Sequence, residues 1–386
     1  MKRIDRRMNC WGLLLGLVCT TTLSAPLADL SGGQSGRIEF QSTTPANRFA
    51  LIRNNQAQTQ SQVVWGDLYM PKNIPSGTKV SAVVMSHGTE GVSTAGHDTY
   101  TEVWTRALNN AGVATFIVDT FTPRSQGNMS GSKVSSINIA ANISDSLHAL
   151  KLLATHPQID ASRIFHMGWS LGGTTVLDAA MPAIGKHVLP DGLRWAGSAS
   201  LYPGCNVKWR SDHLGVAPSP ILMLLGETDD NTPAPACVEY AKTLARDGNP
   251  ITFKVYPGAG HDFDRREEWP RQIQHGVYVD CNIEIKIAGQ SGLGSAYDFR
   301  QQKPITSFPE LDAAIKSCYR MGTVTIAGQR QAREQSVKDV LAFIKTAQRV
   351  PQTAVPTSAS RPAAPSDLTH EQRTDEILRE LAGGKK

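Results

Sequence analysis

The residues best suited to covalent chemistry lie in the stretch His166–Gly173, which has the pattern Gly-x-Ser-x-Gly around Ser170. A serine hydroxyl is a poor nucleophile unless it is held beside a base. A sharp strand-to-helix turn exposes the hydroxyl, but it crowds the backbone. Residues without a Cβ are therefore favoured two positions before and after the serine. Gly168 and Gly172 occupy those positions. The stretch predicts a nucleophile elbow; a glycine-rich turn with a helix-capping serine is the alternative.

Two later loops carry the acid and the base that such a serine needs. The apolar run Ser219–Gly226 predicts a core strand, and Asp229 and Asp230 follow it. His261 lies in a glycine-rich loop after the next predicted strand. Serine, aspartate and histidine in this order, each past a strand, predict a catalytic triad. We choose Asp229 as the acid because it comes early in its turn. Asp230 is the alternative, unless these acids cap the helix 234–246.

Backbone amides beside the serine predict an oxyanion hole. A helix that starts after Ser170 points the amide of Leu171 at charge forming there. A second amide is expected from the turn His87–Gly91, which follows a β-branched run typical of a buried strand. Within that turn Thr89 is our choice, with the residues on either side of it as alternatives. The side chain of His87 itself is expected to pin the loop.

Three further side chains are candidates for contact with a substrate. Trp169 precedes the serine and lies either against the substrate or in the core. Arg124 follows a predicted strand, at the sheet edge where ligands of α/β proteins bind, and could hold an acidic or carbonyl-bearing group. It could equally brace its own loop. Glu90 could shape the pocket or be solvated.

The elements that must position these residues alternate between strands and helices. Strands are predicted over 62–70, 80–85, 114–118, 163–167, 195–202, 219–226 and 251–256, and helices over 99–111, 137–155, 171–181, 234–246 and 331–347. Residues 31–47 are expected to be irregular. This alternation predicts an α/β fold with a mostly parallel central sheet and helices on both faces.

Residues 265–326 depart from this alternation and predict an insertion before the last helix. From Val277 to Ile287 apolar and polar residues alternate, which is typical of a half-buried strand. Cys318–Ile326 is expected to be its partner. The insertion is expected to form a lid or an edge beside His261.

The N-terminal residues 1–28 have the features of a signal peptide, with a basic start, the apolar run 11–18 and small residues before a cleavage site. The apolar run is too short for a comfortable membrane span. We expect export to the periplasm or the medium, with no stable membrane insertion after cleavage. A disordered or membrane-anchoring N-terminus is the alternative. A hydrolase domain is then expected over 29–349, followed by a Pro/Ala-rich linker and a charged tail over 350–386.

Four of the six cysteines lie beyond the predicted signal. An even number in an exported chain favours disulfides, and four cysteines allow three connectivities. We expect Cys205–Cys237 and Cys281–Cys318, with buried free thiols as the alternative.

The overall composition is that of an ordinary globular protein, with 40% hydrophobic and 19% charged residues in a chain of 386. The net charge of +5 is modest, and no basic block carries interleaved aromatic residues, so nucleic-acid binding is not expected. No Cys-x-x-Cys or histidine-rich cluster indicates a metal, and the expected chemistry needs no cofactor.

The chain resembles the dienelactone hydrolase family of α/β-hydrolases. The resemblance rests on Gly168–Gly173, the turn Asp229–Pro233 and Gly260-His261, and it extends over about residues 63–344. It implies an α/β-hydrolase fold with Ser170 as nucleophile, Asp229 as acid and His261 as base. The best-known members carry a cysteine nucleophile and are compact cytosolic proteins. The resemblance therefore implies fold and triad rather than dienelactone as the substrate.

These features together predict an exported serine hydrolase that cleaves small-molecule carboxylic esters through an acyl-enzyme. A peptidase of the prolyl-oligopeptidase type shares the order of the triad but usually brings an extra domain. A lipase with the insertion as its lid is a second alternative. A catalytically silent binding protein is a third, although all three triad positions are filled.

Overall fold

The computed structural model of the chain describes residues 25–92, 97–125, 139–211, 219–288 and 292–348. Nearly all of the predicted signal peptide lies outside these ranges, and so do the predicted linker and tail after residue 349.

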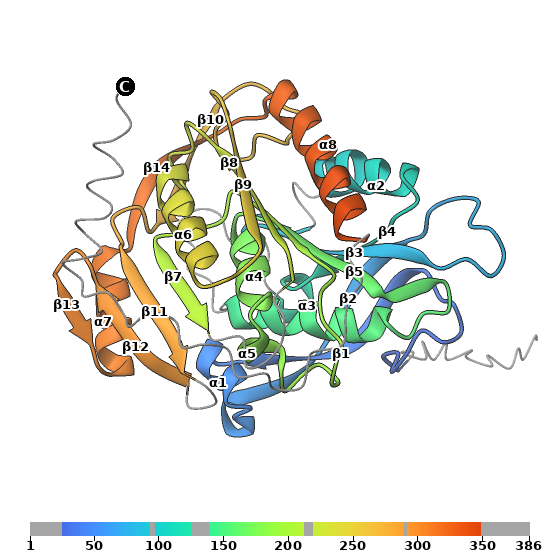
Figure 1. Cartoon of the computed structure of the whole chain (residues 1–386), viewed down its shortest axis with the longest axis horizontal. Helices are drawn as coiled ribbons and strands as arrows, with labels where there is room; N and C mark the ends of the chain where they lie inside the picture. Colours follow the sequence, from blue (N-terminus) through green and yellow to red (C-terminus); the bar gives the residue numbers. More distant parts are fainter. Residues whose placement is uncertain (1–24, 93–96, 126–138, 212–218, 289–291, 349–386) are drawn as a thin grey trace, which may run out of the picture.

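An eight-stranded sheet forms the centre of the molecule, in the order β1-β2-β4-β3-β5-β6-β8-β9 (Figure 1). Its strands are β1 (Gly36–Pro45), β2 (Thr59–Tyr69), β3 (Val80–Ser86), β4 (Ala114–Asp119), β5 (Ile159–Trp169), β6 (Ser198–Leu201), β8 (Ile221–Gly226) and β9 (Ile251–Tyr256). β2 pairs antiparallel with both of its neighbours, and the other pairs are parallel. The predicted mostly parallel sheet is confirmed.

Helices cover both faces of this sheet. One face carries α3 (Ile139–Leu153), α4 (Leu171–Ala179) and α6 (Ala234–Arg246). The other carries the π-helix η2 (His97–Thr105), α2 (Arg106–Asn110) and α8 (Arg330–Ala347). Short elements complete this part of the fold: α1 (Arg48–Ile52), α5 (Pro182–Gly185), η1 (Gln56–Gln58) and η3 (Thr122–Arg124).

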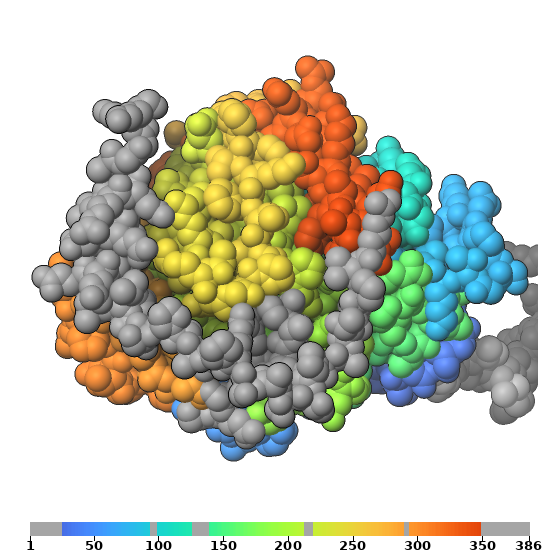
Figure 2. Space-filling view, viewed as in Figure 1, coloured from blue at the N-terminus to red at the C-terminus, as the bar shows by residue number. Residues whose placement is uncertain are grey.

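The strand side chains explain this layering. In β3, Ala82 and Val84 belong to the core under α3, whereas Val83 and Met85 belong to the core under α8. A strand buried on both faces needs a continuous apolar run, which β3 has from Ala82 to Met85 between its two serines. In Figure 2, α6 and the segment around β9 (yellow) occupy the middle of one molecular face, between α8 and the orange β11–β12 region.

The first strand was not expected. Residues 31–47 were predicted to be irregular, but β1 pairs with β2 from Gly36 opposite Leu68 to Pro45 opposite Thr59. Ile38, Phe40 and Ser42 point inward and are buried. The Gly, Ser, Thr and Gln content of the stretch hid this period of two, and β1 rather than β2 forms the edge of the sheet.

The region 265–326 forms two separate structures. β10 (Arg271–Val277) and β14 (Arg320–Ile326) pair as a two-stranded antiparallel ribbon, which we call the ribbon. A second sheet, in the order β13-β12-β11-β7, joins β7 (Val207–Ser211), β11 (Ile283–Ala288), β12 (Gly292–Asp298) and β13 (Lys303–Ile305). α7 (Phe308–Cys318) leads from the second sheet back to the ribbon.

The continuous strand predicted from Val277 to Ile287 is therefore wrong. A turn, in which the amide of Cys281 donates to the carbonyl of Tyr278 at 2.9 Å, splits it. Of the predicted strand, only Val277 belongs to β10, which pairs with β14, whereas Ile283–Ile287 after the turn belong to β11, which pairs with β7. The apolar alternation continues from Val277 through the turn at Val279 and Cys281 into β11, so the sequence pattern conceals the turn.

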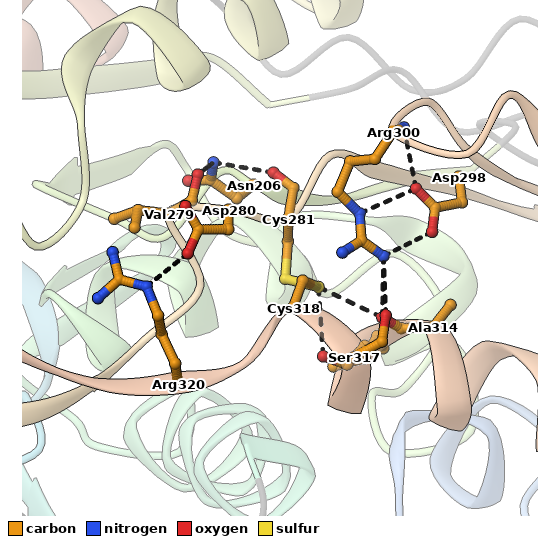
Figure 3. Close-up of a disulfide and its surroundings, with 11 residues drawn as sticks. Asn206, Val279, Asp280, Cys281, Asp298, Arg300, Ala314, Ser317, Cys318 and Arg320 are labelled. Carbon is orange, nitrogen blue, oxygen red and sulfur yellow. Dashed lines mark hydrogen bonds and ion pairs between the residues drawn. A yellow bond between two sulfur atoms is a disulfide. The ribbon is translucent and has the colours of Figure 1, made fainter.

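Both expected disulfides are present. Cys205–Cys237 joins the loop after β6 to α6, and Cys281–Cys318 joins the base of the ribbon to the end of α7 (Figure 3). Asp280 and Arg320, beside the second bridge, form an ion pair across the base of the ribbon. Two disulfides indicate an oxidising environment. Within the described ranges, no helix has the length and apolar character needed to cross a membrane.

Candidate active site

Ser170 lies at the sharp turn between β5 and α4. Its backbone has φ of 52° and ψ of −113°, a region that a residue with a side chain rarely adopts. A Cβ on Gly168 would lie 2.4 Å from the carbonyl oxygen of Gly172. A Cβ on Gly172 would lie 1.9 Å from that of Ser86. The close backbone contacts of this turn therefore require glycine at both positions.

The structure brings the three predicted triad residues together. His261 Nε2 lies 3.0 Å from Ser170 Oγ, and His261 Nδ1 lies 2.8 Å from Asp229 Oδ2. Asp229 Oδ1 accepts the amides of Asn231 at 2.9 Å and Thr232 at 2.8 Å. These bonds fix the carboxylate, which in turn fixes the orientation of the imidazole.

The charges around His261 raise its affinity for a proton. Burial alone lowers the pKa of His261, but the charge of Asp229, the hydrogen bond to it and the charges of Asp262 and Asp230 raise it to about 9. Asp262 Oδ1 lies 4.0 Å from the imidazole Nε2 that faces Ser170. The neutral imidazole that can accept a proton is therefore favoured by alkaline pH.

The second acid of the turn makes a different contact. The carboxylate of Asp230 accepts the amide of Thr325, in β14, at 2.9 and 3.2 Å. Asp230 thus anchors the ribbon, whereas Asp229 contacts His261.

A pocket opens beside Ser170, with about 360 Å³ of empty space that is partly open to solvent. Its lining consists of Gly88, Thr89, Glu90, Tyr100, Trp169, Ser170, Asn231, His261, Asp262, Ile273, His275 and Ile326. The ribbon supplies the last three. It is held over the pocket by a hydrogen bond between Thr89 Oγ1 and His275 Nε2 at 3.1 Å, and by the amide of Ala327, which donates to the carbonyl of His261 at 3.2 Å.

The loop after β3 is held by side chains. The Nδ1–H of His87 donates to the carbonyl of Gly88 at 2.8 Å, and its Nε2 accepts the amide of Thr120 at 3.2 Å. Burial lowers the pKa of His87, which fits this neutral, bridging role. The amide of Gly88 donates to the hydroxyl of Tyr100 at 3.0 Å. Thr89 lines the pocket, and Leu171 begins α4, where the first amides have no partner within the helix.

The predicted substrate-binding residues divide into two groups. Trp169 and Glu90 line the pocket, and Glu90 forms an ion pair with Arg265 at 3.0 Å. The structure does not bring Arg124 there. Its side chain is 5% exposed and pairs with the buried carboxylate of Asp145 at 2.8 Å. It also donates to Thr44 Oγ1 and to the carbonyls of residues 43 and 120, so it braces its own loop.

Sequence reasoning missed a buried carboxylate behind the triad. Asp264 accepts hydrogen bonds from the indoles of Trp104 and Trp169 and from the hydroxyl of Tyr202, each at 2.6 Å. Burial raises the pKa of Asp264. The ring of Tyr202 lies 4.8 Å from that of His261, so this acid positions both neighbours of the triad. The acidic loop around His261 was its only signal in the sequence.

Metal ligands do not gather in this pocket. Across the parts of the chain that the structure describes, no group of three or more His, Cys, Asp or Glu side chains is placed to hold a metal ion. The groups that face the pocket instead suit proton transfer and nucleophilic attack.

Comparison with known proteins gives one family. The model of the dienelactone hydrolase family matches residues 66–277, more than half of the chain. A candidate dienelactone hydrolase from Klebsiella pneumoniae has 18% identity and a TM-score of 0.42, over 59% of this chain and 88% of that one. A thermophilic esterase from Thermogutta terrifontis, with propionate bound, has 15% identity and a TM-score of 0.41, over 52% and 81%. A search of curated proteins found no match. The family match shows that the chain belongs to the dienelactone hydrolase family and is a carboxylic ester hydrolase.

Proposed function

We propose that the chain is an exported serine esterase that cleaves a small-molecule carboxylic ester through an acyl-enzyme. The continuous hydrogen-bonded path Ser170–His261–Asp229, at the floor of a pocket, carries this proposal. Its members come from three different loops at one edge of the sheet, where catalytic groups of α/β proteins gather.

The geometry supports a two-step acyl transfer. His261 Nε2 takes the proton of Ser170 as Oγ attacks the ester carbonyl, and Asp229 stabilises the imidazolium that forms. Collapse of the tetrahedral intermediate returns that proton to the departing alcohol and leaves an acyl group on Oγ. Water then attacks the acyl-enzyme with His261 again as base, which releases the acid and restores Ser170.

Two amides are assigned to the oxyanion. Leu171 offers the first amide of α4, where the helix dipole favours negative charge. Thr89 is favoured over Gly88 because the hydroxyl of Tyr100 already engages the amide of Gly88. One such donor is typically worth ~3 kcal/mol in the transition state.

The charges of the pocket favour an uncharged ester. Among the described residues of its lining, the charged groups other than the triad histidine are the acids Glu90 and Asp262, and neither Lys nor Arg is present. Arg265 is already paired with both Glu90 and Asp262 at 3.0 Å. A carboxylate on the substrate would therefore meet the like charges of Glu90 and Asp262, with no lysine or free arginine in the described lining to pair with it.

Export is supported by two features together. The N-terminal segment has the composition of a signal peptide. The two disulfides suit an oxidising compartment, such as the periplasm or the medium.

Hydrolysis of p-nitrophenyl acetate by the full-length chain tests the proposed chemistry, with Ser170→Ala beside it. We expect turnover by the natural chain, loss of it in the variant, and labelling of Ser170 by a fluorophosphonate. Turnover that survives in Ser170→Ala would remove the serine from the mechanism. A chain that neither turns over esters of varied acyl length nor reacts with the phosphonate would be a silent binding protein.

A further inference from the structure

Tyr100 lies beside the nucleophile and has no part in the mechanism above. It belongs to η2, is 6% exposed, and lines the pocket. Its ring packs against that of Trp169, with centroids 4.6 Å apart, and Trp169 directly precedes Ser170. The ring is therefore fixed by the same strand that positions the nucleophile.

The hydrogen bonds of Tyr100 leave its proton available. A phenol has one O–H to donate and lone pairs to accept. The oxygen accepts the amide of Gly88 at 3.0 Å, so that bond does not use the phenolic proton. Within the described part of the chain, the Tyr100 hydroxyl makes no other hydrogen bond. Burial raises its pKa, so the phenol keeps its proton across the working pH range.

The position of the hydroxyl relative to Ser170 follows from Gly88. A Cβ built on Gly88 would lie 3.7 Å from the Tyr100 hydroxyl oxygen and 3.6 Å from Ser170 Cβ. The hydroxyl and the nucleophile therefore flank the same glycine. Because the amide of Gly88 donates into the phenol oxygen, it polarises the O–H bond and strengthens it as a donor.

We propose that the hydroxyl of Tyr100 is a third donor to the oxyanion, beside the amides of Leu171 and Thr89, and thus a catalytic residue. The proposal rests on the proposed ester hydrolysis. The proton stays on the phenol throughout, and the hydrogen bond strengthens as the carbonyl oxygen gains charge. A donor aimed at developing charge acts on the transition state more than on bound substrate.

Tyr100→Phe tests this role, because it removes the hydroxyl and keeps the ring against Trp169. We expect kcat to fall about 10²-fold with little change in KM. The rate is divided by the concentration of reactive Ser170, measured by titration with a fluorophosphonate, so that misfolded protein does not lower the apparent kcat. A kcat within about twofold of the natural value, or a loss confined to KM, would overturn the proposal.

The binding affinity of a trifluoromethyl ketone is a second measurement, and it separates the loss of an oxyanion donor from a change in packing. Ser170 Oγ adds to the carbonyl carbon of such a ketone while its proton passes to His261, and the product is a hemiketal oxyanion. Its affinity for Tyr100→Phe should fall by the same factor as kcat/KM, because both report the tetrahedral state. An unchanged affinity would contradict the role.

Tyr278→Phe is the matched control, because that tyrosine is 46% exposed and does not line the pocket. It should leave kcat and ketone binding unchanged. The two proposals fail differently. If the natural chain neither hydrolyses esters nor reacts with the phosphonate, the proposed function fails. If it does both and Tyr100→Phe equals it, only the role of Tyr100 fails.

Discussion

The elbow and the ribbon meet at one pocket but are held there by different means. The elbow is fixed by backbone contacts, since Gly168 and Gly172 each lie where a Cβ would overlap a carbonyl. The ribbon is held by a few hydrogen bonds, from Thr325 to Asp230, between Thr89 and His275 and from Ala327 to His261, and by a disulfide at its base. The nucleophile is thus positioned by the backbone of the central sheet, whereas the ribbon that lines the pocket is held by contacts between loops.

The family match covers the elbow and all three triad residues, but only one strand of the ribbon. It ends at residue 277, so it includes β10 but not β14, and Ile326 lies beyond it. We predict that the ribbon influences which esters enter, because Ile273, His275 and Ile326 line the pocket. Substitutions in the elbow and the triad should therefore lower turnover, whereas substitutions in the ribbon should change substrate preference.

The largest contrast is expected between adjacent acids. Asp229→Asn should lower kcat about 10⁴-fold, because the imidazole loses its orienting carboxylate. Asp230→Asn should cost less than about tenfold, because its carboxylate accepts an amide of the ribbon and, within the described residues, makes no hydrogen bond to His261. Steady-state kinetics of both variants provides the measurement. Equal losses would mean that the two acids share one role.

A glycine substitution should damage the elbow through stability. Gly172→Ala places a Cβ 1.9 Å from the carbonyl oxygen of Ser86, so β3 and α4 must separate. We expect the free energy of unfolding to fall by ~3 kcal/mol or more. Gly204→Ala is the control, because the nearest atom would lie at 3.5 Å. Urea unfolding of both variants tests this, and two similar midpoints would show that the elbow has room to relax.

Widening the ribbon wall should change preference rather than chemistry. Ile273→Ala and Ile326→Ala remove apolar bulk from the pocket lining. The ratio of kcat/KM for p-nitrophenyl hexanoate over acetate should rise about tenfold or more, since a few methylenes of pocket space discriminate to that extent. Gln274→Ala, on the exposed side of β10, should leave the ratio unchanged. A fall in turnover of both esters without a change in their ratio would place these residues in the support of the triad instead.

The smallest effect is expected from charge beside the base. Because the pKa of His261 is raised to about 9, kcat/KM should rise with pH and level off above that value. Asp262→Asn removes a charge that raises this pKa, so the acid limb of the profile should move to lower pH. The raised pKa also stabilises the fold fully below about pH 6.5, and this contribution is lost as pH rises through about 9. A pH–rate profile that does not move in the variant would exclude Asp262 as a cause.

The sequence predicted what depends on local spacing. The elbow, the order of the triad and the parallel sheet follow from short motifs and from strands that are apolar throughout. It did not predict what depends on distant partners. Arg124 is buried because Asp145 lies opposite it, and the letters around Arg124 do not show that pairing. Tyr100 reaches the pocket because η2 turns it toward Gly88, a contact twelve residues away in the chain.

The pairing of the ribbon shows the same limit. The apolar alternation from 277 to 287 is real, but a turn divides it between two sheets. The two-residue period of apolar side chains predicts which side chains share a face of a strand, but it does not predict which strands are neighbours. The register of β10 with β14 is set by the ends of the ribbon, at Asp230 and at the disulfide.

The Cys205–Cys237 bridge encloses the acid of the triad. Its loop contains Asp229, and the hydroxyl of Thr232 joins that turn to the carbonyl of Tyr202 at 3.0 Å. A chain with reduced cysteines lacks this clamp on the loop that orients the base. In a reducing cytosol, newly made protein would therefore hold Asp229 less firmly than the oxidised protein does. The esters of the cytosol would meet the chain in that less ordered form. The firm placement of the acid is thus linked to an oxidising environment, in which the bridge can form.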